Sequence, residues 1–208
     1  MTTNAPLVLY RHPLSGHCHR VELLLSLAAL PCELVTVDLL AGAQKRPEFL
    51  EKNRLGQVPV LVHGELTLPD SNAILTYLAE TFPSATPYAP RSAQDRARMQ
   101  RWLSVAAGPL ATGPAAARLV KVFGAQLDHA QASSTAARLF AVLEAELVER
   151  DFIVGASPSL ADLALYAYTA RAPEGDVSLE PFPHLRAWLA RVEALPRFLP
   201  MQHAPARS

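Results

Sequence analysis

The chain has 208 residues, of which 50% are hydrophobic and 18% are charged, which excludes an intrinsically disordered protein and provides for a sizeable core. Lysine and arginine together number 19, as do aspartate and glutamate, so the net charge gives no support for a nucleic-acid-binding surface. No apolar run is long enough to cross a bilayer, Met1–Pro6 lack the pattern of a secretory signal, and two cysteines make no disulfide framework, so we expect a cytoplasmic protein without a membrane partner.

Short β-like runs alternate with helical stretches in the first part of the chain. A compact apolar run predicts a buried strand over 7–10, and a second strand is predicted over 34–37. Apolar residues at helical spacing predict a helix over 17–30, which Pro31 ends. Pro47 suits the first position of a short helix.

A hairpin and a further helix follow. Apolar runs over 58–62 and 66–68 flank His63-Gly64-Glu65, which predicts a hairpin with glycine at its turn. A helix is expected directly after Asp70-Ser71. The order β-α-β-α-β-β-α predicts a parallel pair of strands from the βαβ unit and an antiparallel pair from the hairpin, hence a mixed four-stranded sheet flanked by helices.

The second half of the chain has a different texture. Prolines and small polar residues predict a linker over 84–92, between a first domain of 1–83 and a second of 93–208. The second domain is rich in alanine and leucine without an alternating pattern, which predicts an all-α domain. Helices are expected near 93–107, 113–127, 134–150, 160–170 and 184–195.

Three further features of this domain are predicted. The small polar residues of 128–134 favour a turn, and the tail 200–208 is expected to fray. Ser159 is a good helix N-cap, and Asp162 three residues later can complete a capping-box exchange, which gives Asp162 a structural role.

The strand-turn-helix over 10–21 is the first candidate site. Ser15 and Cys18 stand in the order S-x-x-C at a helix N-terminus, where unpaired N–H groups favour an anion. Because Ser15 stands where a dithiol motif has its first cysteine, dithiol chemistry within one chain is not available. A hydroxyl there suits donation of a hydrogen bond to the thiolate of a bound ligand.

Four motifs in order resemble the soluble (cytosolic) glutathione S-transferase family, and in particular its bacterial-type members that use a serine. The motifs are SGHCHRV at 15–21, NRLGQVPVL at 53–61, DSNAI at 70–74 and SLADLA at 159–164. The resemblance covers nearly the whole chain. It implies a thioredoxin-like α/β N-terminal domain that binds glutathione and an all-α C-terminal domain.

The resemblance also implies roles for residues at the sulfur and along the peptide. Ser15 would donate to the glutathione sulfur and stabilise the thiolate, since donors lower a thiol pKa from about 8.5. Val58-Pro59 would be a cis peptide bond, and the Val58 backbone would then pair with the extended ligand as an added strand does.

The two ends of glutathione have their own candidates. Asp70 would accept from the ammonium of the γ-glutamyl group, while Ser71 and the N–H groups of its helix would hold the neighbouring carboxylate. Gln44 and Lys45 lie where the family contacts the glycyl carboxylate. Gln44 stands in place of a histidine found in some classes, and Arg54 replaces a proline often seen in the second motif.

The implied function is that of a glutathione transferase, with glutathione as co-substrate and no metal. Its thiolate would attack a small electrophilic or hydrophobic substrate, in a detoxification reaction, or reduce peroxides or disulfides. The resemblance further implies a homodimer. Alternatives are a non-catalytic binding or regulatory protein, a glutathione-dependent isomerase, which Gly16-His17 after Ser15 disfavours, and a thioredoxin-type reductase that works through Cys18.

Other readings of single residues stay open. Ser15 could only cap its helix, as could Asp70 and Ser71. Tyr10 is a second candidate for the catalytic hydroxyl. Cys18 matches the position of a resolving cysteine, which favours a core role over a reactive one. His12, His17 and His19 fit no standard zinc spacing. Cys32 is predicted to lie in the core, Asn53 to shape the loop before Pro59, and Trp102 and Trp188 to be packing residues.

Overall fold

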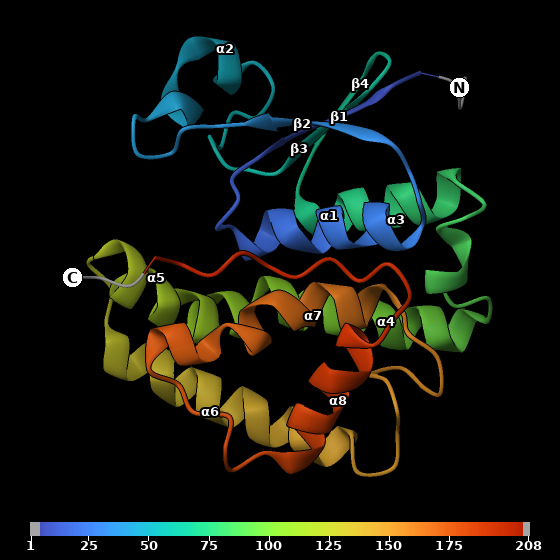
Figure 1. The fold of residues 1–208 in the computed structure, drawn as a ribbon, viewed down its shortest axis with the longest axis vertical. Coiled ribbons are helices and arrows are strands. Elements are labelled where there is room, and N and C mark those ends of the chain that lie inside the picture. The colour runs from blue at the N-terminus through green and yellow to red at the C-terminus, as the bar shows by residue number, and fades with distance from the viewer. Residues whose placement is uncertain (1–4, 206–208) are drawn as a thin grey trace. The chain divides into compact units, whose positions relative to one another are not determined.

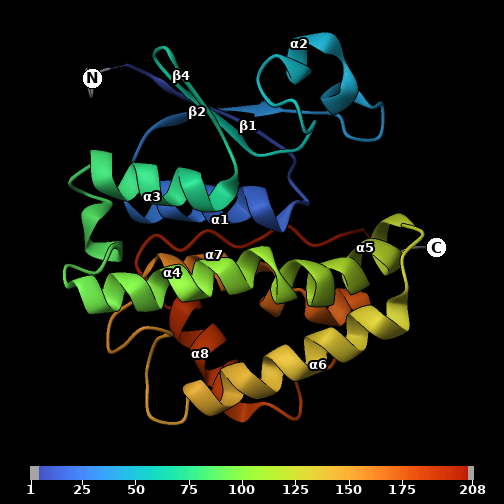
Figure 2. The same ribbon diagram turned by 180° about the vertical axis from the view of Figure 1, so that it is seen from behind.

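The computed structural model describes residues 5–205, which divide into two compact units (Figures 1 and 2). Unit 1 takes in the chain up to Ala89 together with Leu199–Gln202, and unit 2 takes in Pro90–Phe198 and the segment from His203. The predictions for the N-terminus and for the tail extend into 1–4 and 206–208, which lie outside the described residues. Met201 is buried, so the tail packs against the protein at this residue, whereas Gln202 and His203 are exposed.

Unit 1 holds the expected mixed sheet. Its elements are β1 (Leu7–Arg11), α1 (Gly16–Leu27), β2 (Cys32–Thr36), the 3-10 turn η1 (Ala43–Lys45), α2 (Pro47–Leu50), β3 (Val60–His63), β4 (Leu66–Pro69), α3 (Ser71–Thr81) and the 3-10 turn η2 (Thr86–Tyr88). The strand order is β2-β1-β3-β4, with β1 parallel to β2 and antiparallel to β3, and β3 antiparallel to β4. The element order and the strand directions predicted from the sequence are confirmed.

Boundaries in unit 1 shift for local reasons. Helix α1 ends three residues before the predicted end, because Ala29 has a left-handed backbone with a φ of 54°. His63 belongs to β3, opposite Leu66, so the hairpin turn is only Gly64-Glu65, and Gly64 supplies the required positive φ of 60°.

The two faces of the sheet are covered by different helices. Figure 1 shows α1 and α3 on one face and α2 on the other. Tyr10 of β1 packs against Phe49 of α2, with ring centroids 6.3 Å apart. Because side chains alternate along a strand, Leu7 and Leu9 point to the opposite face, where they are buried.

The regular elements in the described residues of unit 2 are all helical. Its elements are α4 (Ala93–Ala107), a π-helical turn η3 (Ala111–Ala115), α5 (Ala116–Phe123), α6 (His129–Glu146), α7 (Leu160–Ala170), the 3-10 turn η4 (Ala172–Gly175) and α8 (Pro183–Glu193). Every residue of α7 from Leu160 to Thr169 is buried, as expected for a helix at the centre of a domain. Trp102 and Trp188 are also buried, which confirms their packing role.

One expectation for unit 2 is wrong, and the bounds of a second change. The segment 128–134 is not a turn but opens α6, because the Asp128 side chain accepts a hydrogen bond from the Gln131 N–H at 2.9 Å and caps the helix. The helix predicted over 113–127 is a π-helical turn followed by α5, which Gly124 ends with a φ of 70°. No helix within 5–205 combines the length and the apolar character needed to cross a membrane.

Asp162 joins three parts of unit 2 through its buried carboxylate. One carboxylate oxygen accepts from the Ile153 N–H and from the Trp188 indole N–H, both at 2.8 Å. The other accepts from the N–H and the hydroxyl of Ser159, at 2.8 and 2.9 Å. Burial raises the pKa of Asp162, and these four donors oppose that effect. The structural role predicted for Asp162 is confirmed.

Replacing Asp162 with alanine is therefore expected to destabilise the protein severely. Four buried donors would lose their acceptor, which should lower the free energy of unfolding by roughly 3–5 kcal/mol. Denaturant titration followed by circular dichroism measures this change. The control Asp151→Ala alters an exposed aspartate nearby in the chain and should change stability by less than about 0.5 kcal/mol. Equal stability of the two variants would contradict the assigned role.

Candidate functional site

Strand register brings the predicted site segments to one end of the unit 1 sheet. Tyr10 near the end of β1 pairs with Val60 at the start of β3, and Val60 pairs with Pro69 at the end of β4. The turn after β1, the Val58-Pro59 bond before β3 and the Asp70-Ser71 pair after β4 therefore lie at the same end. This arrangement follows from strand order and direction alone.

Ser15 is the N-cap of α1. Its hydroxyl oxygen accepts a hydrogen bond from the Cys18 N–H at 3.3 Å, and its carbonyl accepts from the His19 N–H at 2.9 Å. The bond from Cys18 occupies a lone pair of the hydroxyl oxygen and leaves the hydroxyl hydrogen able to donate. Ser15 thus caps the helix and remains a donor, so the two readings of this residue are compatible.

Cys18 is a buried thiol. Its side chain is 0% exposed, and its sulfur accepts from the His12 N–H at 3.4 Å. Burial raises the pKa of the Cys18 thiol to about 12, although hydrogen bonds from Ser15 and His12 act in the opposite direction. A thiol with this pKa is protonated at neutral pH, which disfavours the reductase alternative.

Cys32 is the other thiol of the chain, and Tyr10 is the second candidate for the catalytic hydroxyl. Cys32 lies half-buried on β2, an edge strand, so its predicted core position is wrong. The ring of Tyr10 packs on the α2 face of the sheet, with the Lys52 ammonium 5.4 Å from its centroid. Because α1 covers the opposite face (Figure 1), this placement favours Ser15 over Tyr10.

Asp70 caps α3 and has a backbone φ of 76°, which is uncommon for a residue with a side chain. One carboxylate oxygen accepts from the N–H groups of Asn72 and Ala73, both at 2.9 Å. The Ser71 N–H, in contrast, has no acceptor among the described residues. The exposed Asp70 carboxylate and the open Ser71 N–H thus lie side by side at the start of α3. An α-amino acid group requires both, since it carries an ammonium and a carboxylate on one carbon.

The Val58-Pro59 peptide bond is cis, as the resemblance implied. Within the described chain, the N–H and the carbonyl of Val58 make no backbone hydrogen bond. Asn53 shapes the loop before them as predicted, because its side chain donates to the Gln57 carbonyl at 2.8 Å and accepts from the Leu55 N–H at 3.0 Å.

Gln44 and Lys45 lie in η1, against the loop that precedes Val58. The Lys45 ammonium donates to the Leu55 carbonyl at 3.3 Å. A Cβ at Gly56, whose φ is 60°, would lie 2.8 Å from the Gln44 carbonyl oxygen, so only glycine fits this contact. The buried side-chain oxygen of Gln44 has no partner among the described residues.

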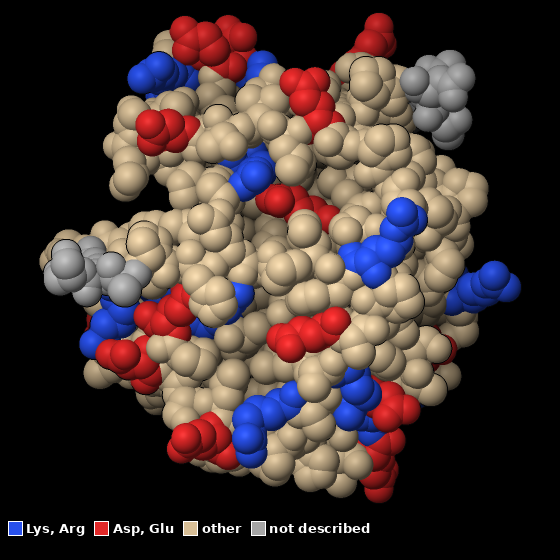
Figure 3. All heavy atoms as spheres, viewed as in Figure 1, with Lys and Arg blue, Asp and Glu red and all other residues tan. Residues whose placement is uncertain are grey.

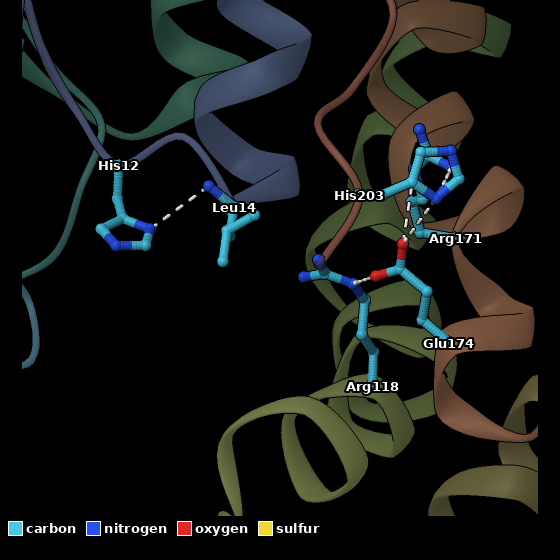
Figure 4. Close-up of polar contacts among 6 residues, drawn as sticks. All are labelled: His12, Leu14, Arg118, Arg171, Glu174 and His203. Atoms are coloured by element: carbon cyan, nitrogen blue, oxygen red, sulfur yellow. Dashed lines mark hydrogen bonds and ion pairs between the residues drawn. The ribbon is translucent and has the colours of Figure 1, made fainter. Parts of the chain in front are cut away.

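Two of the histidines near Cys18, His12 and His19, make separate contacts. His12 accepts from the Leu14 N–H at 3.3 Å (Figure 4), and the His19 ring, buried on α1, is hydrogen bonded to the Leu199 carbonyl at 2.8 Å. Within 5–205 there is no group of three or more His, Cys, Asp or Glu side chains arranged to hold a metal ion.

Arg20 is a site residue to which the sequence assigned no role, although it belongs to the first motif. It is 1% exposed in the buried part of α1, where it lies next to the buried His19 and among apolar residues. Its guanidinium donates to the Ser71 hydroxyl oxygen at 3.3 Å and to the Asn72 side-chain oxygen at 2.9 Å. The signal in the sequence is a charged residue inside a run of buried positions, since such a residue needs buried partners.

A charged cluster in unit 2 surrounds Glu174. The buried Arg118 guanidinium is 2.6 Å from one carboxylate oxygen, while Arg171 and His203 approach the other at 3.8 and 3.4 Å (Figure 4). On the face drawn in Figure 3, acidic and basic side chains are interspersed without an extended patch of one sign. The cluster ties α5, η4 and the C-terminal segment together.

Family models and relatives agree with the motifs. Residues 5–80 match the model of the glutathione S-transferase N-terminal domain, and 114–196 match that of the C-terminal domain. Glutathione S-transferase 3 of Zea mays is 36% identical over 205 residues, covering 93% of this chain and 92% of that protein. Glutathione S-transferase theta-2B of Homo sapiens is 33% identical over 174 residues, covering 79% and 71%.

Solved structures give the same result for the fold. The crystal structure of a glutathione S-transferase from Pseudomonas fluorescens has a TM-score of 0.88 at 31% identity, covering 95% of this chain and 99% of that chain. A structure of a possible glutathione S-transferase from Rhodopseudomonas palustris has a TM-score of 0.87 at 32% identity, with 96% and 99% covered. The chain therefore belongs to the glutathione S-transferase family, as its four motifs predicted.

Proposed function

We propose that this glutathione S-transferase binds glutathione at the end of the unit 1 sheet where β1, β3 and β4 meet α1 and α3, and transfers it to small electrophilic substrates. The observation that carries the proposal is the pairing of two capped helix starts at that end. The start of α1 offers the Ser15 hydroxyl, and the start of α3 offers the Asp70 carboxylate beside the Ser71 N–H.

Ser15 is the proposed catalytic residue. In the ligand-free chain its hydroxyl lies beside the neutral Cys18 thiol, which is a weak acceptor. The thiolate of a bound glutathione is a far stronger, charged acceptor, so the hydroxyl hydrogen would turn to it. The partial positive charge at the start of α1 adds to this stabilisation. The bound thiol would then ionise near neutral pH and attack an electrophilic carbon.

The rest of glutathione would extend along the end of the unit 1 sheet described above. The γ-glutamyl ammonium would meet Asp70 and its carboxylate would meet Ser71. The peptide backbone would pair with Val58 beside Pro59, and Gln44 and Lys45 would face the glycyl carboxylate. The supporting observation is that the backbone N–H and carbonyl of Val58 are open within the described chain.

We extend the proposal to the domain boundaries and to the oligomeric state. Residues 1–83 would form the glutathione-binding domain, 84–92 the linker, and 93–208 the helical domain that supplies contacts to the second substrate. We further propose a cytoplasmic homodimer, on the resemblance to the family. Light scattering at micromolar concentration tests the oligomeric state.

Ser15→Ala should lower kcat/KM toward a small aryl halide by roughly 10²-fold, because one donor to the developing anion is lost. The dissociation constant for glutathione, measured by calorimetry, should change little. Two variants separate donation from helix capping. Ser15→Thr retains both and should rescue activity, whereas Ser15→Asp retains the cap but repels a thiolate and should not. Full activity of Ser15→Asp would contradict the role.

Asp70→Asn should weaken glutathione binding about tenfold, because it removes the charge that faces the ammonium. Asparagine also tolerates a positive φ and caps helices well, so thermal stability should stay close to that of the parent. Calorimetric titration and thermal unfolding measure the two quantities. Unchanged affinity for glutathione would show that Asp70 only caps α3.

The thiols of the folded protein should resist alkylation. Burial raises the pKa of Cys18 to about 12 and that of Cys32 to about 11. At pH 8 the Cys18 thiolate is then so scarce that iodoacetamide should label it roughly 10³-fold more slowly than a free thiol. Mass spectrometry follows the labelling, and unfolding in urea should restore it. Cys18→Ser should keep its transferase activity, and rapid labelling or lost activity would revive the reductase alternative.

A further inference from the structure

The start of α3 is held by a buried cation that belongs to α1. Arg20 lies one and a half turns along α1 from Ser15, and it is 1% exposed. One nitrogen of its guanidinium donates to the Ser71 hydroxyl oxygen at 3.3 Å and to the Asn72 side-chain oxygen at 2.9 Å. Burying a guanidinium costs free energy unless it is hydrogen bonded, so these contacts matter to the fold and to the site.

The bond from Arg20 decides what the Ser71 hydroxyl can do. A serine hydroxyl has one hydrogen to donate and two lone pairs that accept, while a guanidinium only donates. Since the Ser71 oxygen accepts from Arg20, its hydrogen must point elsewhere, and it has no acceptor among the described residues. The hydroxyl hydrogen and the backbone N–H of Ser71 are therefore two open donors on one residue.

We propose that Arg20 is a positioning residue for glutathione, which fixes Ser71 as a double donor to the γ-glutamyl carboxylate. This inference rests on the proposed function. A carboxylate only accepts hydrogen bonds, so a serine whose oxygen is already engaged by Arg20 is set in advance to match it. The guanidinium charge behind Ser71 favours the same anion.

Asn72 holds the Arg20 guanidinium in place beside Ser71. Its side-chain oxygen accepts from Arg20, while its backbone N–H donates to the Asp70 carboxylate. Arg20 thus fixes the first turn of α3 from the inside, and Asp70 fixes it from the exposed side. The helix that carries Ser15 and the helix that carries Ser71 are joined through one side chain.

A double-mutant cycle on glutathione affinity tests the proposal. Arg20→Met should raise the calorimetric dissociation constant about tenfold, as should Ser71→Ala. The double variant should be little weaker than either single variant, because both remove the same contact to the ligand. At saturating glutathione, kcat should stay within about twofold of the parent value, since the thiol end is untouched. Additive effects in the double variant would overturn the role of Arg20.

Binding of a glutathione analogue provides a second test of the proposal. An analogue of glutathione without the γ-glutamyl carboxylate should bind weakly to the parent, and Arg20→Met should weaken it no further. An equal loss for glutathione and for the analogue would overturn the proposal. Failure of the parent to bind glutathione at all would overturn the proposed function as well, so the two failures are distinguishable.

Two further variants guard against a general loss of structure. Arg118→Met removes an equally buried guanidinium from unit 2, and should lower the melting temperature without changing the dissociation constant for glutathione. Binding weakened as much as by Arg20→Met would overturn the proposal. If Arg20→Met does not fold, Arg20→Lys keeps a donor and a charge. It should bind glutathione roughly threefold more weakly than the parent and again show a non-additive cycle with Ser71→Ala.

Discussion

The hydrogen bond from the Cys18 N–H to the Ser15 hydroxyl oxygen is the contact on which the site depends. It ends the irregular turn after β1 and starts α1 at a defined residue. It also leaves the hydroxyl hydrogen of Ser15 available for a ligand. At the start of α3 the Ser71 hydroxyl oxygen also accepts a hydrogen bond, in this case from the Arg20 side chain. In both places a serine accepts from within the protein and is thereby left to donate outward.

The sheet turns these two helix starts into one site. Because β3 runs antiparallel to β1 and β4 antiparallel to β3, the chain returns twice to the same end of the sheet. The element order and the parallel and antiparallel strand pairs could be predicted from the alternation of β and α patterns. Three of the four motifs contain the residues that meet at that end. The cis bond at Val58-Pro59 followed from the resemblance, since composition alone does not distinguish a cis from a trans proline.

The features that the sequence did not predict have one local cause and two tertiary causes. The start of α6 was missed because small polar residues favour turns and helix starts alike, and the Asp128 cap decides between them. The half-buried position of Cys32 depends on β2 being an edge strand, which local pattern does not reveal. Arg20 was visible as a charge among apolar residues, but its partners Ser71 and Asn72 lie about fifty positions away, and only the packing of α1 against α3 brings them together.

The central claim is that the start of α1 stabilises a thiolate on the ligand rather than on the protein's own cysteine. The most direct measurement is a pH titration of the thiolate ultraviolet absorbance of glutathione bound to the protein, with both protein cysteines changed to serine. We expect the thiol of bound glutathione to have a pKa at least one unit below the value of about 8.5 for a free cysteine thiol. Bound glutathione that titrates like a free thiol would contradict it.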